Sequence, residues 1–203
     1  MLLDVLFPTS CLACGEPARR SLCVICSDAI PTLLRPITPP PGVATAWILG
    51  AYDGPLGAWV RQGKYQGDPS AFTAMGKRLA EAGVGRLPRV DAVTPVPVPW
   101  RRRMKRGFDQ AELLARAVGR PLGIPVRRML RRVDPTEQST RSTRQRAVGA
   151  RGAFAHVGPP APERVLLIDD VITSGATARA CAEALLCEGG RRIHLLCVAS
   201  ARH

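Results

Sequence analysis

The stretch VLLIDDVITSGAT, residues 165–177, decides the fold of this chain. Its first four residues are aliphatic, which is typical of a strand in the middle of a parallel sheet. Two adjacent carboxylates, Asp169 and Asp170, follow, and a short loop then leads into a helical pattern from about Ser174. A buried strand, a polar loop and a helix in this order predict an α/β sheet with the acids at the carboxyl end of a strand.

After residue 42, strand-like runs alternate with helical patterns. We predict strands at 45–52, 90–96 and 192–200, and helices at 55–65, 69–83 and 107–119. The proline-rich RPITPPPG at 35–42 can continue neither a helix nor a central strand, so it marks a boundary. The sequence therefore predicts a small module at 1–36 and an α/β domain at 43–203. Within this domain, residues 130–154 have the polar, aperiodic character of a mobile basic loop.

The loop after the acids is suited to an anion. Backbone N–H groups at the start of a helix lack partners within the helix, and the helix dipole places positive charge there. Gly175 and Ala176 allow an anion to approach the backbone, while Thr173, Ser174 and Thr177 supply hydroxyl donors. The two carboxylates would repel a phosphate, so we predict that they bind sugar hydroxyls with a divalent cation nearby. The alternative is an ordinary buried strand followed by a capped helix.

All thirteen residues of this stretch resemble the phosphoribosyl pyrophosphate signature of type I phosphoribosyltransferases. The resemblance implies the fold of that family, a mostly parallel sheet flanked by helices. It also implies that Asp169 and Asp170 bind the ribose hydroxyls and Mg²⁺, and that Thr173–Thr177 bind the 5′-phosphate. Thr173 stands where the hypoxanthine-type salvage enzymes have a further Asp that deals with the base, which argues against that substrate class.

A second stretch, TPVPVPWRRRMKRGFDQAELLA at 94–115, resembles the ComF/GntX family of competence-associated proteins. That family has a proline-rich turn, then basic residues, then Arg-Gly-Phe-Asn-Gln at the start of a helix. Here the last five residues are 106–110, with Asp109 in place of the usual Asn. The turn corresponds to the loop that holds pyrophosphate in related enzymes, and we predict that Pro97, Val98, Arg102 and Arg106 bind pyrophosphate. For the arginines, the alternative is a solvated basic turn.

Residues 136–154 occupy the place of the mobile hood that closes over substrate in the wider fold. Gln138 and Arg146 fit the ComF/GntX pattern, whereas Gly149 replaces the usual Asn. A disordered basic loop is the alternative. Lys64 and Tyr65 match a Lys-Tyr position of the family, but the resemblance assigns them no role.

Four cysteines near the start of the chain have the spacing of a metal site. Cys11, Cys14, Cys23 and Cys26 form C-x2-C-x8-C-x2-C, and two such pairs can supply the four thiolates of a tetrahedral zinc site. The ComF/GntX resemblance covers this module too. We predict a structural Zn²⁺ that holds the module in shape, with disulfides or a redox pair as the alternatives.

The chain is strongly basic, and its charge is concentrated. Its 203 residues carry a net charge of +13, and residues 101–151 hold fifteen Arg or Lys against four acids. Such a charge indicates phosphate-bearing partners. The sequence has no secretory signal and no run of roughly 18 apolar residues, so we expect a cytoplasmic protein without membrane insertion. It also has no Walker A motif and no nucleophile pair typical of a hydrolase.

Two functions from different classes follow. In the first, the chain is a phosphoribosyltransferase-like protein that binds Mg-phosphoribosyl pyrophosphate and serves DNA uptake in natural competence or nucleotide metabolism. The sequence does not indicate its acceptor or its catalytic residues. In the second, it is a non-catalytic competence factor that binds single-stranded DNA through the basic block and the zinc module, alongside proteins of the competence machinery. Only 4% of the residues are aromatic, which disfavours sequence-specific recognition of bases.

Overall fold

The computed structural model describes residues 10–19, 21–133 and 153–201. Its main sheet has five strands in the order β1-β2-β7-β6-β3. These are β1 (Arg35–Ile37), β2 (Thr45–Ala51), β7 (Arg192–Ser200), β6 (Arg164–Ile172) and β3 (Ala92–Pro95). Only β1 is antiparallel to its neighbour; the other three pairs of this sheet are parallel. The predicted α/β fold with a mostly parallel sheet is confirmed.

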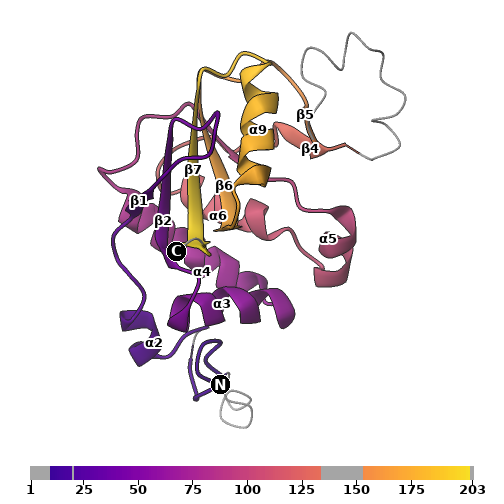
Figure 1. The fold of residues 1–203 in the computed structure, drawn as a ribbon. Helices are drawn as coiled ribbons and strands as arrows, with labels where there is room; N and C mark the ends of the chain where they lie inside the picture. The colour runs from indigo at the N-terminus through magenta and orange to yellow at the C-terminus, as the bar shows by residue number, and fades with distance from the viewer. Residues whose placement is uncertain (1–9, 20, 134–152, 202–203) are drawn as a thin grey trace.

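Helices cover both faces of the sheet (Figure 1). One face packs against α3 (Gly54–Tyr65), α4 (Pro69–Gly83) and α6 (Gln110–Gly119). The other face packs against α9 (Ala176–Leu186) and a ribbon of two antiparallel strands, β4 (Leu130–Arg132) and β5 (Phe154–His156). The remaining helices are α2 (Val24–Asp28) and α5 (Trp100–Arg106).

The aliphatic residues of β6 belong to the hydrophobic cores on both faces of the sheet. Val165 and Leu167 pack in the core on the α9 side, while Leu166 and Ile168 pack in the core on the α4 and α6 side. All four side chains are fully buried. Because successive residues of a strand point to opposite faces, a strand covered on both faces must be apolar throughout, as this one is. Burial of each such side chain contributes about 1.5–3 kcal/mol.

Close packing of α4 on α6 depends on a glycine. A Cβ on Gly76 would lie 2.5 Å from the Cβ of Ala117 and 3.0 Å from the backbone oxygen of Leu114. The two helices therefore approach more closely here than any larger residue would allow. This contact fixes α6, whose first residues adjoin the candidate site.

Two sequence-based predictions of elements are wrong in part. The predicted helix at 107–119 is α6 preceded by a turn: Gly107, at φ 79°, ends α5, and α6 begins only at Gln110. The predicted basic loop at 130–154 has strands at both ends, because Leu130 and Phe154 are buried in the core on the α9 side. Its central part, with Gln138, Arg146 and Gly149, lies outside the described residues.

The N-terminal module contacts the α/β domain. Leu12, Ile30 and Leu34 belong to the same buried cluster as residues of α3 and α4, and Arg78 of α4 donates a hydrogen bond to the backbone oxygen of Ser27 at 2.9 Å. The division into a module at 1–36 and a domain at 43–203 stays a prediction, and β1 lies across the first of these boundaries. Among the described residues, no helix is long and apolar enough to cross a membrane.

Candidate phosphoribosyl-binding site and cysteine cluster

Asp169 and Asp170 lie within β6 and not after it. The strand continues to Ile172, and its last residues pair with Ala199 and Ser200 of β7. On its other side β6 loses its neighbour earlier, because β3 ends at Pro95 opposite Ile168. The sequence-based expectation that the strand ends where the acids begin is therefore wrong. The two acids nevertheless lie beyond the end of β3, where β6 is paired with β7 alone.

The Asp169 side chain is held by the backbone of the next residue. Its Oδ1 accepts a hydrogen bond from the backbone N–H of Asp170 at 2.8 Å. Burial, followed by the charge of Asp170, raises the pKa of the Asp169 carboxyl to about 8. A bound cation would reverse this balance by favouring the ionised carboxylate.

Asp170 is held by a residue distant in the sequence. Its side chain is nearly buried, and its Oδ2 lies 3.0 Å from Nζ of Lys64, in the last turn of α3. Apart from this ion pair, no described residue hydrogen-bonds this oxygen. Sequence reasoning noted Lys64 only as a family match and missed this pairing, since 105 residues separate the two along the chain.

The loop after β6 turns sharply into α9. Gly175 precedes α9 with φ 80°, a left-handed conformation that costs glycine little, and Ser174 Oγ accepts a hydrogen bond from Ala176 N at 3.3 Å. Asp169, Thr173, Gly175 and Thr177 line one small hollow of about 30 Å³. The structure thus brings together the first predicted ribose ligand and the predicted phosphate loop. A sugar phosphate is too large to fit inside this hollow.

The predicted pyrophosphate loop borders a basic cleft of about 550 Å³. Pro97 and Val98 line it, but the predicted Arg102 and Arg106 do not. Instead the arginines that line it are Arg101, Arg103, Arg128, Arg131 and Arg132. Three of these come from the segment that leads into and through β4. Sequence reasoning missed them because their position depends on the β4–β5 pairing.

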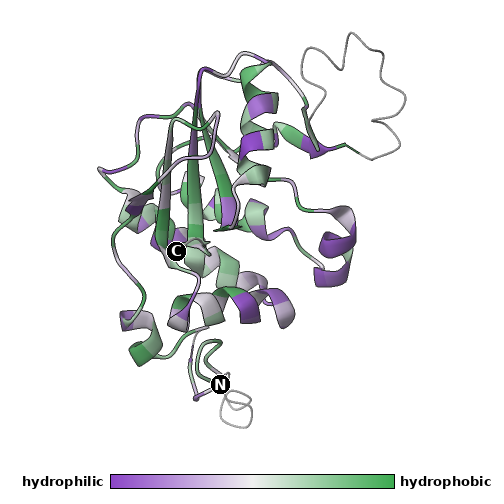
Figure 2. Cartoon of the chain, viewed as in Figure 1, coloured by the Kyte–Doolittle hydropathy of each residue, from purple (hydrophilic) through white to green (hydrophobic). Residues whose placement is uncertain are grey.

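The other two predicted arginines have different surroundings. Arg102 is exposed on α5, a helix that buries none of its residues and that Figure 2 shows as largely hydrophilic. Arg106 is half-buried, and its Nη1 is buried without a hydrogen-bond partner among the described residues. An unpaired buried donor is costly, which makes Arg106 the better candidate of the two for an anion.

Asp109, which replaces the family Asn, has a structural role. Its Oδ1 accepts a hydrogen bond from the backbone N–H of Glu112 at 3.1 Å, so it caps α6. It also lines the basic cleft. The pKa of Asp109 is raised above its usual value because the side chain is buried, and the charges of Arg128 and Arg103 oppose this shift. Asp is as good an N-cap as Asn, so the exchange leaves this cap intact.

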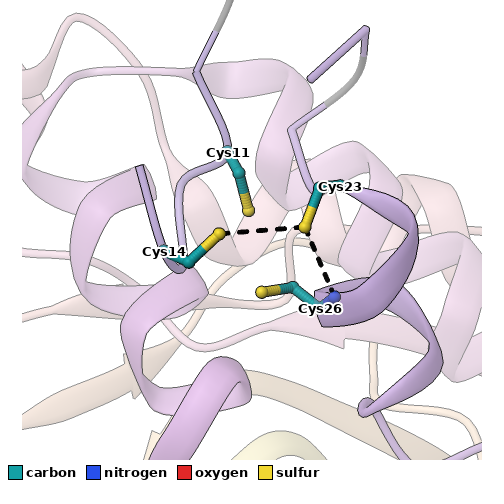
Figure 3. A group of neighbouring side chains, drawn as sticks. All are labelled: Cys11, Cys14, Cys23 and Cys26. Carbon is teal, nitrogen blue, oxygen red and sulfur yellow. Dashed lines mark hydrogen bonds between the residues drawn. The ribbon is translucent and has the colours of Figure 1, made fainter. Parts of the chain in front are cut away.

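The four N-terminal cysteines converge on one point (Figure 3). Their sulfurs all lie within 4.8 Å of one another, and the Cys14 and Cys23 sulfurs are 3.8 Å apart. Tetrahedral zinc with Zn–S of about 2.3 Å requires sulfurs about 3.8 Å apart. A disulfide would need about 2.05 Å. The cluster therefore fits a metal such as zinc, and all four thiols are free.

Backbone N–H groups support the cysteine sulfurs. Ala13 N lies 3.4 Å from Cys11 Sγ, and Cys26 N lies 3.5 Å from Cys23 Sγ. Burial raises the pKa of the Cys11 thiol, but hydrogen bonds from backbone N–H groups lower it to about 6. Burial raises the pKa of Cys26 to about 12. A cation at the centre of the cluster would favour the thiolate form of all four.

Comparisons with known proteins agree with the sequence resemblance. No protein-family model matches the chain. The chain is 29% identical over 202 residues to DNA utilization protein YhgH of Salmonella typhi, covering 93% of this chain and 88% of that protein. It is 31% identical over 140 residues to competence protein F of Haemophilus influenzae, covering 64% and 61% of the two chains.

Among solved structures, the chain superposes on a glutamine phosphoribosylpyrophosphate amidotransferase from B. subtilis complexed with ADP and GMP. The TM-score is 0.46, the identity is 24%, and the match covers 64% of this chain and 26% of that one. This superposition is too loose to place a ligand. The sequence relatives, named for competence and for DNA utilization, confirm the predicted resemblance of this chain to the ComF/GntX family.

Proposed function

We propose that this chain binds Mg-phosphoribosyl pyrophosphate at the carboxyl edge of β6. Asp169 and Asp170 bind the ribose hydroxyls and Mg²⁺, Thr173–Thr177 bind the 5′-phosphate, and the turn at Pro97 and Val98 with Arg106 binds the pyrophosphate. The observation that carries this proposal is the shared hollow of Asp169 and the α9 loop. Carboxylates suit sugar hydroxyls, and the start of α9 suits a phosphate.

The donor set also fits the metal. Mg²⁺ prefers oxygen ligands, is bound by one or two carboxylates, and takes its remaining ligands from water and substrate phosphates. When bound, Mg²⁺ would neutralise the diphosphate and favour its departure from ribose C1. Arginines of the basic cleft would add further positive charge beside the leaving group.

A binding experiment tests this proposal. Isothermal titration of phosphoribosyl pyrophosphate in the presence of Mg²⁺ compares the wild type with an Asp169→Asn, Asp170→Asn double variant. Loss of two charge-assisted hydrogen bonds should weaken binding about 100-fold. The matched control removes two exposed carboxylates elsewhere, Asp28→Asn and Asp53→Asn, and should bind like the wild type. Undiminished binding by the Asp169, Asp170 variant would refute the site.

Catalysis needs a separate measurement. We propose that the bound ligand serves DNA uptake or nucleotide metabolism in the cytoplasm, with or without transfer of the phosphoribosyl group. Release of pyrophosphate in the presence of candidate nitrogenous bases would establish a transferase. Tight binding without release for any acceptor would favour a role of phosphoribosyl pyrophosphate as a ligand only.

A second function, binding of single-stranded DNA, is favoured by the surface of α5. This helix carries an exposed Trp100 and Met104 among exposed basic residues, with 62% and 71% of these two side chains accessible. Nucleic-acid strands bind to surfaces that combine positive charge with an aromatic ring on which bases stack. The names of the relatives, which refer to DNA utilization and competence, agree with this function.

Salt dependence tests this second function. Log affinity falls as log salt concentration rises, and replacing Arg101, Arg102 and Arg103 with Gln should make this negative slope less steep by about 2. Trp100→Ala should weaken the binding free energy for single-stranded DNA by about 1–3 kcal/mol, because a stacked base is lost. A control with three exposed arginines elsewhere replaced, Arg35, Arg86 and Arg89, should keep the wild-type slope. Equal slopes for both triple variants would show that α5 is not the binding surface.

A further inference from the structure

We propose that Lys64 is a positioning residue that holds Asp170 for the ribose hydroxyls. This inference rests on the function proposed above and extends it to a residue of α3. It starts from a difference between the two adjacent acids: Asp169 accepts a hydrogen bond from the N–H of the next residue, whereas the buried Oδ2 of Asp170 pairs with the Lys64 ammonium group and has no hydrogen-bond partner among the described residues.

The position of Lys64 is well defined. The residue lies in the last turn of α3, where a positive charge is favoured by the helix dipole, and its side chain is only 18% exposed. Leu56, Trp59 and Val60 anchor α3 in the core. Lys64 therefore presents its ammonium group from a rigid element and not from a loop.

The ion pair determines which oxygen of Asp170 can meet a ligand. Oδ2 is buried beside Lys64 Nζ at 3.0 Å, which leaves Oδ1 as the acceptor for a sugar hydroxyl. A carboxylate oxygen binds a sugar hydroxyl well only if the side chain holds it in a fixed orientation. Lys64 fixes this orientation by pairing with Oδ2 from a half-buried position on α3.

Lys64 thus acts through Asp170 and contacts no ligand atom itself. Without Lys64, the Asp170 side chain would be a buried carboxylate with no counter-charge, free to turn its accepting oxygen away from the sugar. 2-Deoxyribose lacks the 2-hydroxyl and keeps the 3-hydroxyl, so a residue that holds Asp170 on the 2-hydroxyl must affect the binding of ribose more than that of 2-deoxyribose. A lysine that only stabilised the fold would affect the binding of both sugars equally.

The test measures binding of ribose 5-phosphate and 2-deoxyribose 5-phosphate by isothermal titration. Lys64→Met should weaken ribose 5-phosphate about tenfold, which corresponds to about 1.4 kcal/mol, and the deoxy sugar about twofold or less. Lys64→Arg restores the charge and should stay within about threefold of the wild type. Lys77→Met, which removes an exposed lysine of α4, is the matched control and should bind both sugars normally.

A double-mutant cycle tests whether the effect passes through Asp170. In an Asp170→Asn background, Lys64→Met should change ribose 5-phosphate binding less than about twofold. The double variant also leaves no unpaired charge, so it controls for a folding defect of Lys64→Met alone. Equal weakening of both sugars, or a full effect of Lys64→Met without Asp170, would overturn the proposal.

The proposal fails separately from the function on which it rests. If the wild type binds neither these two sugar phosphates nor phosphoribosyl pyrophosphate, the proposed ligand is wrong. The same four proteins then decide the role of Lys64 through their unfolding by urea in the absence of ligand. Coupling between the Lys64 and Asp170 substitutions would show that Lys64 holds this carboxylate, whereas additive effects would overturn the assignment.

Discussion

The cysteine cluster and the acid site differ in how far along the chain their parts come from. The four cysteines lie within 16 residues, from Cys11 to Cys26, and their sulfurs converge without help from the sheet. The acid site combines β6 and the α9 loop with Lys64 of α3, more than 100 residues earlier. A site whose residues are close together in the sequence can be recognised from their spacing. When a site also includes residues from distant elements, only the contiguous residues can be recognised in the sequence.

The two regions also differ in how they depend on a ligand. Four thiols packed within 4.8 Å of one another need a metal to compensate their mutual repulsion as thiolates. The acids of β6 have an internal counter-charge in Lys64, and Asp169 accepts a hydrogen bond from the backbone N–H of Asp170. We therefore expect the cysteine module to require its metal for folding, and the acid site to be formed before its ligand arrives.

The largest expected effect comes from removing the metal from the cysteine cluster. Chelation of the metal, or Cys11→Ser with Cys26→Ser, should lower the free energy of unfolding by at least about 3 kcal/mol, because metal binding contributes to folding directly. Leu12, Ile30 and Leu34 share the core of α3 and α4, so the loss should extend beyond the module. Metal analysis and urea unfolding measure both effects. Exposed Cys187→Ser is the control, and unchanged stability of a metal-free protein would contradict the zinc assignment.

The next effect concerns the ionisation of the acid site in the absence of ligand. Because the pKa of Asp169 is raised from 3.8 to about 8, the folded chain keeps a proton that the unfolded chain releases above about pH 4. The free energy of unfolding should therefore fall as pH rises from about 4 to 8, by at most about 1.4 kcal/mol per pH unit. Asp169→Asn removes this contribution. Urea unfolding at pH 6 and pH 8 checks it, and identical pH dependence of the two proteins would count against the raised pKa.

The elements that were predicted correctly are those with a long periodic pattern. β2, β7, α3 and α4 each have at least seven residues and bury a regular set of side chains, so their apolar spacing appears directly in the sequence. The same holds for the aliphatic first half of β6, whereas its polar second half was not predicted as strand. β1, β4 and β5 have three residues each, too few to show a period, and they form only because a neighbouring strand is in place. In the structure, Leu130 of β4 and Phe154 of β5 are buried.

The candidate site was predictable to the same extent. The acids and the phosphate loop are contiguous, and the structure places Asp169 beside Thr173, Gly175 and Thr177 as the local pattern predicts. The arginines of the basic cleft were predicted less well, because α5 turns Arg102 outward and β4 brings in Arg131 and Arg132. Which arginines face the cleft depends on helix phase and strand pairing, and neither is visible in a run of basic residues.

A smaller effect tests the shape of the phosphate loop. Gly175→Ala should cost about 1–2 kcal/mol of stability, because φ 80° is strained for any residue with a Cβ. It should also weaken ribose 5-phosphate binding by moving the loop. Gly158→Ala, at φ 86° with open space around it, should cost similar stability but leave binding unchanged. Equal binding by both variants would show that the loop does not contact the phosphate.

The smallest expected effect concerns Asp109, where the chain departs from the family pattern. Asp109→Asn keeps the acceptor for the backbone N–H of Glu112, so stability should change by less than about 0.5 kcal/mol, whereas Asp109→Ala should cost about 1 kcal/mol. The Asn variant also removes the negative charge of Asp109 from a cleft lined by arginines. Pyrophosphate should therefore bind a few-fold more tightly at low salt, with the gain lost at high salt. Weaker binding of pyrophosphate by Asp109→Asn would mean that the carboxylate itself organises the arginines, and the cleft would then depend on a distant residue as the acids depend on Lys64.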